Sequence, residues 1–287
     1  MLASALAPSS SKAYERAWKK FTDFVVKNGL PIKFPIPTNY LLWFFTDLHN
    51  KGLAYVSLLP ILSAISYIQK IKHVEDTTKS FKLQQLLLAI KQNKVSGDLR
   101  QPITYSMLSS MLDKLATLPI SAYENCLFKA LFLLSFHFGL RLGEVTDSPH
   151  NLKRDSIFLG KNSMSLTFHS FKHGRGPPIT HEVQSSNSRW CPVVAMDKFL
   201  KLRGSRPGPL FILGNSAVKR GTLNAKLKSL LQLCGIQSKI TSHSFRIGAA
   251  TWWAHLNYSE ARIKRLGRWK SNAFLKYIRG SVVHPTA

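Results

Sequence analysis

Four short patterns in this 287-residue sequence carry side chains that could act together on a phosphate group. The segment GLRLGEV places Arg141 directly after a long apolar stretch, and HSFR places His243 and Arg246 three residues apart. On a helix this spacing puts both side chains on one face, where both can point at one phosphate. The segment LTFHSFKHGRG places Lys172 at a turn, and GRWKSNAFLKYIR places Tyr277 in a final helix.

Each pattern also has an ordinary structural interpretation, which is the better one when the pattern is taken alone. Arg141 could simply pair with Glu144 three residues further on. A histidine and an arginine on one helix face are more often surface residues, a lysine at a turn is usually solvated, and a tyrosine in a helix is usually a core aromatic. Only the combination of the four patterns is specific.

The order and separations of these residues, R … K … HxxR … W … Y, resemble the tyrosine recombinase (phage integrase) family. The resemblance covers nearly the whole chain, because Ser11–Gly29 (SKAYERAWKKFTDFVVKNG) is similar to the start of that family's core-binding domain. The segments RPGPLFIL, HSFRIGAAT and GRWKSNAFLKYIR resemble recombinases of eukaryotic mobile elements of the DIRS and Crypton kind. The resemblance implies six catalytic residues: Arg141, Lys172, His243, Arg246, Trp269 and Tyr277.

The resemblance also implies a role for each of these residues. Tyr277 is similar to the nucleophile that forms a 3′-phosphotyrosine bond and frees a 5′-hydroxyl. Arg141 and Arg246 would bind the non-bridging oxygens, since planar and permanently charged guanidinium groups suit a phosphate that gains charge in the transition state. Lys172 would be the general acid that protonates the departing 5′-oxygen. His243 would hydrogen-bond the phosphate and help to manage the tyrosine proton.

Trp269 is expected to pack against Tyr277 and position it, but the spacing leaves an alternative. The family usually has its His/Trp position nine residues before the tyrosine, whereas Trp269 precedes Tyr277 by eight residues and Arg268 by nine. The GRWxS pattern is typical of the eukaryotic-element branch, which favours Trp269. Arg268 is then expected to be a surface charge that affects mainly DNA affinity. In the alternative, Arg268 reaches the phosphate as a third cation.

The charge of the chain indicates a polyanionic partner. Lys and Arg number 40 against 14 Asp and Glu, a formal net charge of +26. Such an excess repels itself in a compact globule unless a polyanion offsets it, and basic side chains gain affinity for nucleic acid by releasing its counterions. We expect double-stranded DNA as the partner and no membrane, because no basic amphipathic helix or lipidation signal is evident. A basic RNA-binding protein is a weaker alternative, since no RNP, KH or GXXG pattern appears.

Cofactors and metals are not expected. Beyond Asp155 only three carboxylates remain, Glu182, Asp197 and Glu260, too few and too scattered for a two-metal nuclease. The three cysteines are far apart, which argues against both a disulfide framework and a zinc site. Exchange of a phosphodiester for a phosphotyrosine ester is isoenergetic, so the implied reaction needs no ATP.

The apolar periodicity predicts a mainly α-helical protein of two domains. Four helices, within 9–29, 39–50, 58–71 and 81–91, predict a small N-terminal bundle. Residues 93–102 lose this periodicity, so we expect a helical core-binding domain at 1–96, a linker at 97–102 and a catalytic domain at 103–287. The second half predicts further helices and one small antiparallel sheet, with strands at 156–159, 163–171 and 179–183.

Two hypotheses about function remain open from the sequence. The first is an active site-specific DNA recombinase or integrase, working in the nucleus and assembling as a dimer or tetramer on DNA. The second is a catalytically idle DNA-binding protein derived from such an enzyme. The complete set of six residues favours the first hypothesis, because a protein that only binds DNA has no need of all six.

Overall fold

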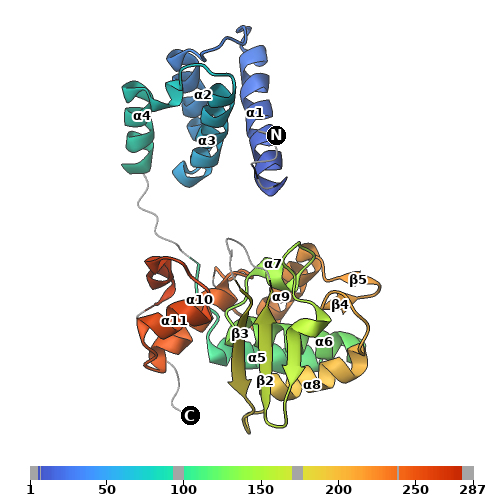
Figure 1. The fold of residues 1–287 in the computed structure, drawn as a ribbon. Coiled ribbons are helices and arrows are strands. Elements are labelled where there is room, and N and C mark those ends of the chain that lie inside the picture. Colours follow the sequence, from blue (N-terminus) through green and yellow to red (C-terminus); the bar gives the residue numbers. More distant parts are fainter. Residues whose placement is uncertain (1–5, 7, 93–99, 170–176, 238, 280–287) are drawn as a thin grey trace. The chain divides into compact units, whose positions relative to one another are not determined.

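The computed structural model describes residues 6, 8–92, 100–169, 177–237 and 239–279 (Figure 1). Contacts divide the chain into two compact units, Met1–Gly97 and Asp98–Ala287, each with its own hydrophobic core. The predicted linker at 97–102 falls partly on residues 93–99, outside the described part of the chain. Among the described residues, no helix is both long enough and apolar enough to cross a membrane.

Unit 1 is a helical bundle, as predicted. Its elements are α1 (Pro8–Lys27), α2 (Thr38–Asn50), α3 (Tyr55–Ile71), the 3₁₀ turn η2 (Thr77–Lys79) and α4 (Phe81–Gln92). One apolar face of each helix packs into a common core that includes Phe21, Phe44 and Ile65. The buried amide of Gln69 accepts hydrogen bonds from the Ile36 backbone N–H at 3.0 Å and from the Thr77 hydroxyl at 3.1 Å, which fixes the loops to α3.

Unit 2 is mainly helical with a small antiparallel sheet, which confirms the predicted fold class. Its helices and 3₁₀ turns are α5 (Tyr105–Ala116), α6 (Ala122–His137), α7 (Leu142–Val145), η3 (Arg154–Ser156), α8 (Pro192–Arg203), α9 (Arg220–Leu233), α10 (Ser244–His255), α11 (Glu260–Leu266) and η4 (Asn272–Tyr277). Its strands are β1 (Ile157–Leu159), β2 (Ser163–Phe168), β3 (Ile179–Gln184), β4 (Ile212–Leu213) and β5 (Ser216–Ala217). The sequence patterns did not predict α7 or the short β4–β5 pair.

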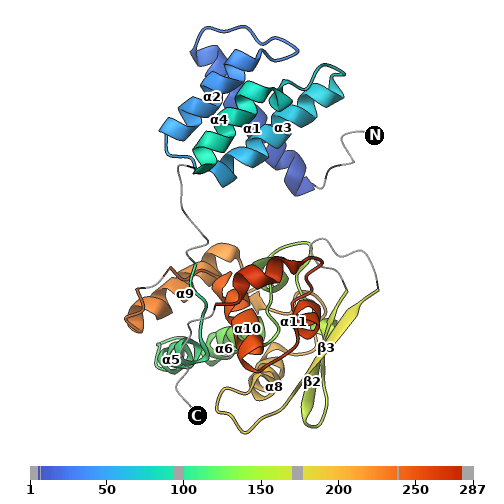
Figure 2. The same ribbon diagram turned by 90° about the vertical axis from the view of Figure 1, so that its left-hand side faces the viewer.

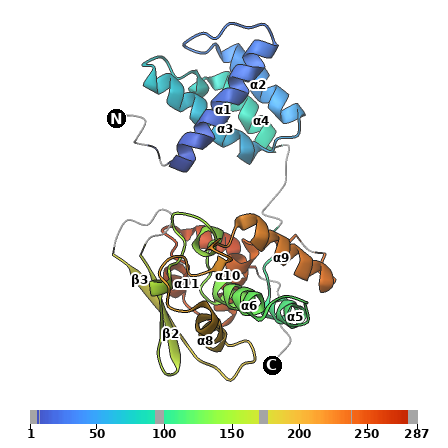
Figure 3. The same ribbon diagram turned by 90° about the vertical axis from the view of Figure 1, so that its right-hand side faces the viewer.

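Helix α6 forms the centre of unit 2. Nine of its residues, all but one of them apolar, are buried, so it is apolar almost all round, as expected for a helix enclosed on every side. Figures 2 and 3 show the three-stranded sheet at one side of the unit and α5 at the opposite side, with α6 between them. Ser121 caps α6 by accepting a hydrogen bond from the Glu124 N–H at 3.1 Å.

The sheet has the order β1-β2-β3, and both pairings are antiparallel. Side chains of β2 alternate between buried and half-buried, so Met164, Leu166 and Phe168 enter the core. The last pair of the β2–β3 register joins Phe168 to Ile179. Strand β2 therefore ends three residues earlier than the predicted 171, and residues 170–176, which carry Lys172, lie outside the described residues.

Candidate active site

The HSFR segment begins helix α10. His243 directly precedes the helix, and the Thr241 N–H donates to the Ser244 hydroxyl at 3.0 Å, which braces the turn. The His243 ring lies against the Tyr277 ring, with centroids 5.1 Å apart and planes inclined at 67°. Further along α10, the Thr251 hydroxyl donates to the Tyr277 carbonyl at 3.0 Å. One helix thus fixes the tyrosine both through its ring and through its backbone.

Arg246, three residues after His243, is only 2% exposed. Its guanidinium donates to the Gly139 carbonyl at 2.5 Å and to the Gly267 carbonyl. These bonds use two of its five N–H donors. The Trp269 ring covers the guanidinium, with the central carbon 4.1 Å from the ring centroid, a cation–π contact.

Arg141 comes from a different part of the chain and caps helix α7. Its backbone N–H donates to Glu144 at 2.8 Å, and its guanidinium donates to the other oxygen of the same carboxylate at 3.2 Å. A further N–H reaches the Arg268 carbonyl at 3.2 Å. The simple pairing with Glu144 is therefore real, but it holds Arg141 next to Arg246 instead of ruling out a shared site.

The segment 267–269 decides which residue meets the tyrosine. Arg268 has the left-handed backbone angle φ of 55°, and its side chain turns inward, fully buried, to form an ion pair with Glu144 at 2.9 Å. Trp269 instead faces the site, with its ring 5.7 Å from that of Tyr277. The surface position expected for Arg268 is therefore wrong: a left-handed residue reverses the direction of the chain locally, and the carboxylate compensates the buried charge.

Glu144 and the arginines form one electrostatic cluster. Burial alone would raise the pKa of Glu144, but the charge of Arg268, the backbone N–H of Arg141 and the charge of Arg141 together hold that pKa below its usual value. The pKa of Arg246 is lowered well below its usual value by burial, and by the neighbouring charges of Arg141 and Arg268. Two of the three guanidinium groups pair with Glu144, and the charge of the third is near them, so positive charge is in excess and the cluster is suited to bind a further anion.

Tyr277 ends the final helix that the sequence predicts, which is a 3₁₀ helix, η4. The Ser271 hydroxyl accepts from the backbone N–H two residues on, so the element begins in a tight turn. With three residues per turn, Phe274 and Tyr277 lie on the same side. Phe274 is buried and contacts Trp269 at 5.9 Å between centroids, and this anchors the side that carries the tyrosine.

Lys172 itself lies outside the described residues, but the strands that lead to it are described. The end of β2 packs on the cluster, since the Arg268 guanidinium lies 3.8 Å above the Phe168 ring. On β3, the His181 ring contacts the same phenylalanine at 5.7 Å between centroids. The β2–β3 hairpin is therefore joined to the cluster at its Phe168–Ile179 end, from which the chain leads to the predicted general acid.

Two glycines, Gly139 and Gly267, complete the site, and the sequence patterns alone assign them no role in it. The Trp269 ring lies directly on Gly267, so that a side chain at this glycine would overlap the ring. Gly139 has a φ of 53°, and a Cβ there would meet Trp253 at 2.9 Å. The signal for both lies in the motifs GLRLGE and LGRW, where a glycine stands close to each arginine.

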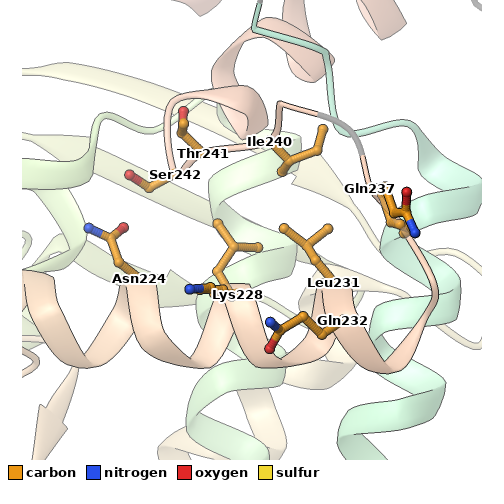
Figure 4. Close-up of a pocket in the computed structure, with 10 residues that line it drawn as sticks. Asn224, Lys228, Leu231, Gln232, Gln237, Ile240, Thr241 and Ser242 are labelled. Carbon is orange, nitrogen blue, oxygen red and sulfur yellow. The ribbon is translucent and has the colours of Figure 1, made fainter.

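A cavity of about 480 Å³ lies apart from these residues, between α9 and the segment that leads to α10 (Figure 4). Lys228 and Leu231 of α9 face Ile240 and Ser242 across it. None of the six predicted residues lines this cavity. This cavity is therefore separate from the candidate site.

In the described part of the chain, no group of three or more His, Cys, Asp or Glu side chains is arranged to hold a metal ion. No protein-family model matches the sequence, and no curated protein matches it. The comparison that succeeds is one of structure. The described fold, a helical bundle followed by a helical unit with a small sheet, is the fold of the tyrosine recombinases and integrases.

Three solved structures illustrate the similarity. A lambda integrase (75-356) dimer bound to a COC′ core site has a TM-score of 0.68 and 15% identity, over 98% of this chain and 93% of that chain. The XerH site-specific recombinase bound to its difH substrate has a TM-score of 0.64 and 16% identity, over 94% and 76%. The Tn1549 transposon integrase (aa 82-397) with circular intermediate DNA has a TM-score of 0.65 and 12% identity, over 96% and 91%.

Proposed function

We propose that this chain is a site-specific DNA recombinase that cleaves and rejoins strands through a 3′-phosphotyrosine bond at Tyr277. The observation that carries the proposal is the meeting of Tyr277, His243, Arg246 and Arg141 in one cluster with excess positive charge. These residues are up to 136 positions apart in the sequence, from 141 to 277. Their meeting is what a phosphate site requires and what separate structural roles would not require.

In the proposed reaction the Tyr277 oxygen attacks the scissile phosphorus while the bond from phosphorus to the 5′-oxygen breaks. Arg141 and Arg246 bind the non-bridging oxygens, whose negative charge grows in the transition state. His243 lies beside the tyrosine ring and takes part in moving its proton. Lys172 supplies the proton that the departing 5′-oxygen needs. The reverse attack by a 5′-hydroxyl rejoins the strand, so one ester bond replaces another at each step.

The DNA substrate is supported by the charge of the chain. The formal net charge is +26, and exposed cations include Lys219, Arg220 and Lys228 on and beside α9. A duplex phosphate backbone offsets such charge by counterion release. The three solved structures named above are DNA complexes, and one of them is a dimer on DNA, so we also propose self-association on DNA for this chain. We also propose an origin in a DIRS- or Crypton-like mobile element, from the sequence resemblance, and a nuclear location, from the resemblance and the DNA substrate.

A catalytically idle DNA-binding protein is the second candidate. It would have the same fold and the same affinity for duplex DNA, so binding cannot separate the two. The contact of Trp269 and His243 with the Tyr277 ring favours the enzyme, because a protein that only grips DNA gains nothing from a tyrosine held against a histidine.

The test is the formation of a covalent adduct. Duplex DNA selected from a random-sequence library by binding to the protein is nicked near each candidate site and incubated with the parent and with Tyr277→Phe. We expect an SDS-resistant adduct with the parent, also in EDTA, and none with Tyr277→Phe, which lacks the nucleophilic oxygen. The DNA affinity of Tyr277→Phe should stay close to that of the parent, because only a single hydroxyl is lost. An adduct that persists in Tyr277→Phe would refute the role of Tyr277, and a parent that binds without forming any adduct would favour the idle protein.

A further inference from the structure

Two consecutive backbone carbonyls hold the two arginines that the proposed reaction uses. The Gly267 carbonyl accepts from Arg246, and the Arg268 carbonyl accepts from Arg141 at 3.2 Å. The next residue, Trp269, covers the Arg246 guanidinium and contacts the tyrosine. The short turn 267–269 therefore touches three of the six predicted residues besides supplying one of them.

The side chain of Arg268 fixes this turn from within. Its guanidinium donates to the Phe138 carbonyl at 3.2 Å and the Leu266 carbonyl at 3.1 Å, and pairs with Glu144 at 2.9 Å. The Phe168 ring at the end of β2 covers it at 3.8 Å. These contacts join the end of α6, the start of α7, the β2–β3 hairpin and the turn, which are the elements that carry or lead to Arg141, Lys172 and Trp269.

From this geometry we infer that Arg268 is a positioning residue for DNA cleavage: its buried side chain sets the turn whose carbonyls and whose tryptophan hold the two arginines and the tyrosine. The inference rests on the proposed function. Arg268 does not reach DNA itself, because its side chain is fully buried and its exposed fraction is 0%. It acts through Arg141, both by its own carbonyl and by the carboxylate of Glu144 that the two arginines share.

The first test separates positioning from mere stability. Arg268→Met removes the guanidinium group, with its charge and its N–H donors, while keeping the approximate length of the side chain. The double variant Glu144→Gln/Arg268→Met also removes the negative charge of Glu144, which would otherwise be buried without its Arg268 partner. Arg203→Met is the matched control, since Arg203 is also a buried arginine of unit 2 but binds only loop carbonyls of residues 204–210. All three are measured for melting temperature, DNA affinity and single-turnover cleavage at saturating DNA.

We expect Arg268→Met to cleave on the order of 100-fold more slowly than the parent, as a shift of about 1 Å in a reacting group can cause, with little change in DNA affinity. The double variant regains melting temperature but not cleavage. Arg203→Met melts at a lower temperature yet cleaves at the parental rate below its transition. Recovery of both stability and cleavage in the double variant, or parental cleavage by folded Arg268→Met, would overturn the inference.

A second test uses the charge of the scissile phosphate. A methylphosphonate at that position carries one negative charge fewer in the transition state, so a displaced Arg141 matters less. The 100-fold defect of Arg268→Met should shrink to below about 10-fold on this DNA, since one arginine is then sufficient. A purely structural defect would slow both DNAs equally, and such an equal loss would count against positioning through Arg141.

A third measurement does not depend on cleavage. In arginine-labelled protein, the Arg141 Nε–H signal, assigned with Arg141→Ala, should shift in Arg268→Met and remain unchanged in Arg203→Met. If the parent forms no adduct with DNA, the proposed function fails, but this signal still reports whether Arg268 sets Arg141. If the parent cleaves and the Arg141 signal does not move in Arg268→Met, the inference fails and the function stands.

Discussion

Two regions of unit 2 bury arginine in different ways. Arg203, the last residue of α8, is 7% exposed and donates only to carbonyls of the loop that follows: Gly204, Arg206, Pro209 and Leu210. Arg246 is 2% exposed and also bonds to two carbonyls, but it lies beside two further arginines and one carboxylate. The first arrangement organises a loop, whereas the second concentrates positive charge.

The difference separates a buried arginine with neutral partners from one whose surroundings are suited to bind an anion. Neutral carbonyls satisfy a buried guanidinium without bringing a second charge near it. In the second region Arg141, Arg246 and Arg268 lie near one carboxylate, Glu144, so like charges are close together. Burial is the main cause that lowers the pKa of Arg246 well below its usual value, and the charges of Arg141 and Arg268 lower it further. Stability gains nothing from that repulsion, so a bound anion is the natural explanation for it.

The largest expected effect comes from removing the central cation. Arg246→Ala should slow single-turnover cleavage by roughly 10³-fold, the upper range for loss of one group that stabilises transition-state charge, because it also releases Gly139 and Gly267 from their hydrogen bonds. Arg203→Ala should cleave normally at temperatures where it is folded. Comparable rates for the two variants would show that the two regions do not differ in function.

The next effect concerns the predicted general acid. Lys172→Ala should lose roughly 10²-fold or more in cleavage of ordinary DNA, and should regain it on DNA with a 5′-bridging sulfur at the scissile bond. A thiolate leaves without a proton, so a missing acid no longer matters. Arg246→Ala is the control, since loss of a phosphate clamp is not repaired by a better leaving group. If sulfur fails to rescue Lys172→Ala, then Lys161 or Arg175 becomes the candidate acid.

A smaller effect is expected at the tryptophan that covers the cluster. Trp269→Phe keeps an aromatic face over Arg246 and should retain much of the cleavage. Trp269→Ala should slow cleavage and lower the melting temperature, by less than the loss of a fully buried tryptophan because Trp269 is only partly buried. Gly267→Ala should displace the same ring, because the added methyl would occupy its place. Its cleavage rate should therefore resemble that of Trp269→Ala more than that of the parent. Thermal melts and single-turnover rates measure both properties, and normal rates in Gly267→Ala would refute the packing argument.

Much of this fold can be predicted from the sequence because its helices are strongly periodic. The helices predicted at 39–50, 58–71 and 81–91 differ from α2, α3 and α4 by no more than three residues at either end. The final predicted helix is present, but the sequence pattern does not specify its type: this six-residue segment, which starts in a serine-capped turn, forms a 3₁₀ helix. Local propensity cannot distinguish an α-helix from a 3₁₀ helix here, because the element is held in place by a tertiary contact, the burial of Phe274 in the core.

The site is predictable only in part, for a different reason. Arg246, His243 and Tyr277 are predicted from the motifs that carry the family resemblance, and the structure brings them together. The inward direction of Arg268 cannot be predicted, because it depends on a left-handed backbone angle and on a carboxylate 124 residues earlier in the chain. A spacing count treats residues 268 and 269 as neighbours on one surface, whereas the backbone turns them to opposite sides.

The smallest expected effect is on stability at mildly acidic pH, and it sharpens the comparison of charged regions. His137 and His181 both have a pKa lowered to about 4, by burial in each case and, for His181, also by Arg268 and Arg265. The Nε2 atom of each ring is buried without a hydrogen-bond partner among the described residues. The unfolded chain, with a histidine pKa near 6.5, therefore binds protons that the folded unit rejects.

The stability that depends on neutral His137 and His181 is fully present above about pH 6.5 and is lost as pH falls toward 4. Glu144 acts in the same direction, since its pKa is lowered on folding, but only below its usual value of 4.5, so urea unfolding between pH 7 and pH 5 reports mainly the histidines. His181→Gln should flatten the pH dependence in that range, and His137→Gln should do so independently of the arginine cluster. Arg268→Met should reduce the His181 contribution to this pH dependence and leave the His137 contribution unchanged, because Arg268 is one of the charges that lower the pKa of His181. A pH dependence that is unchanged in both glutamine variants would mean that neither ring stays neutral in the folded unit, and that the charge of the cluster does not affect His181 on β3.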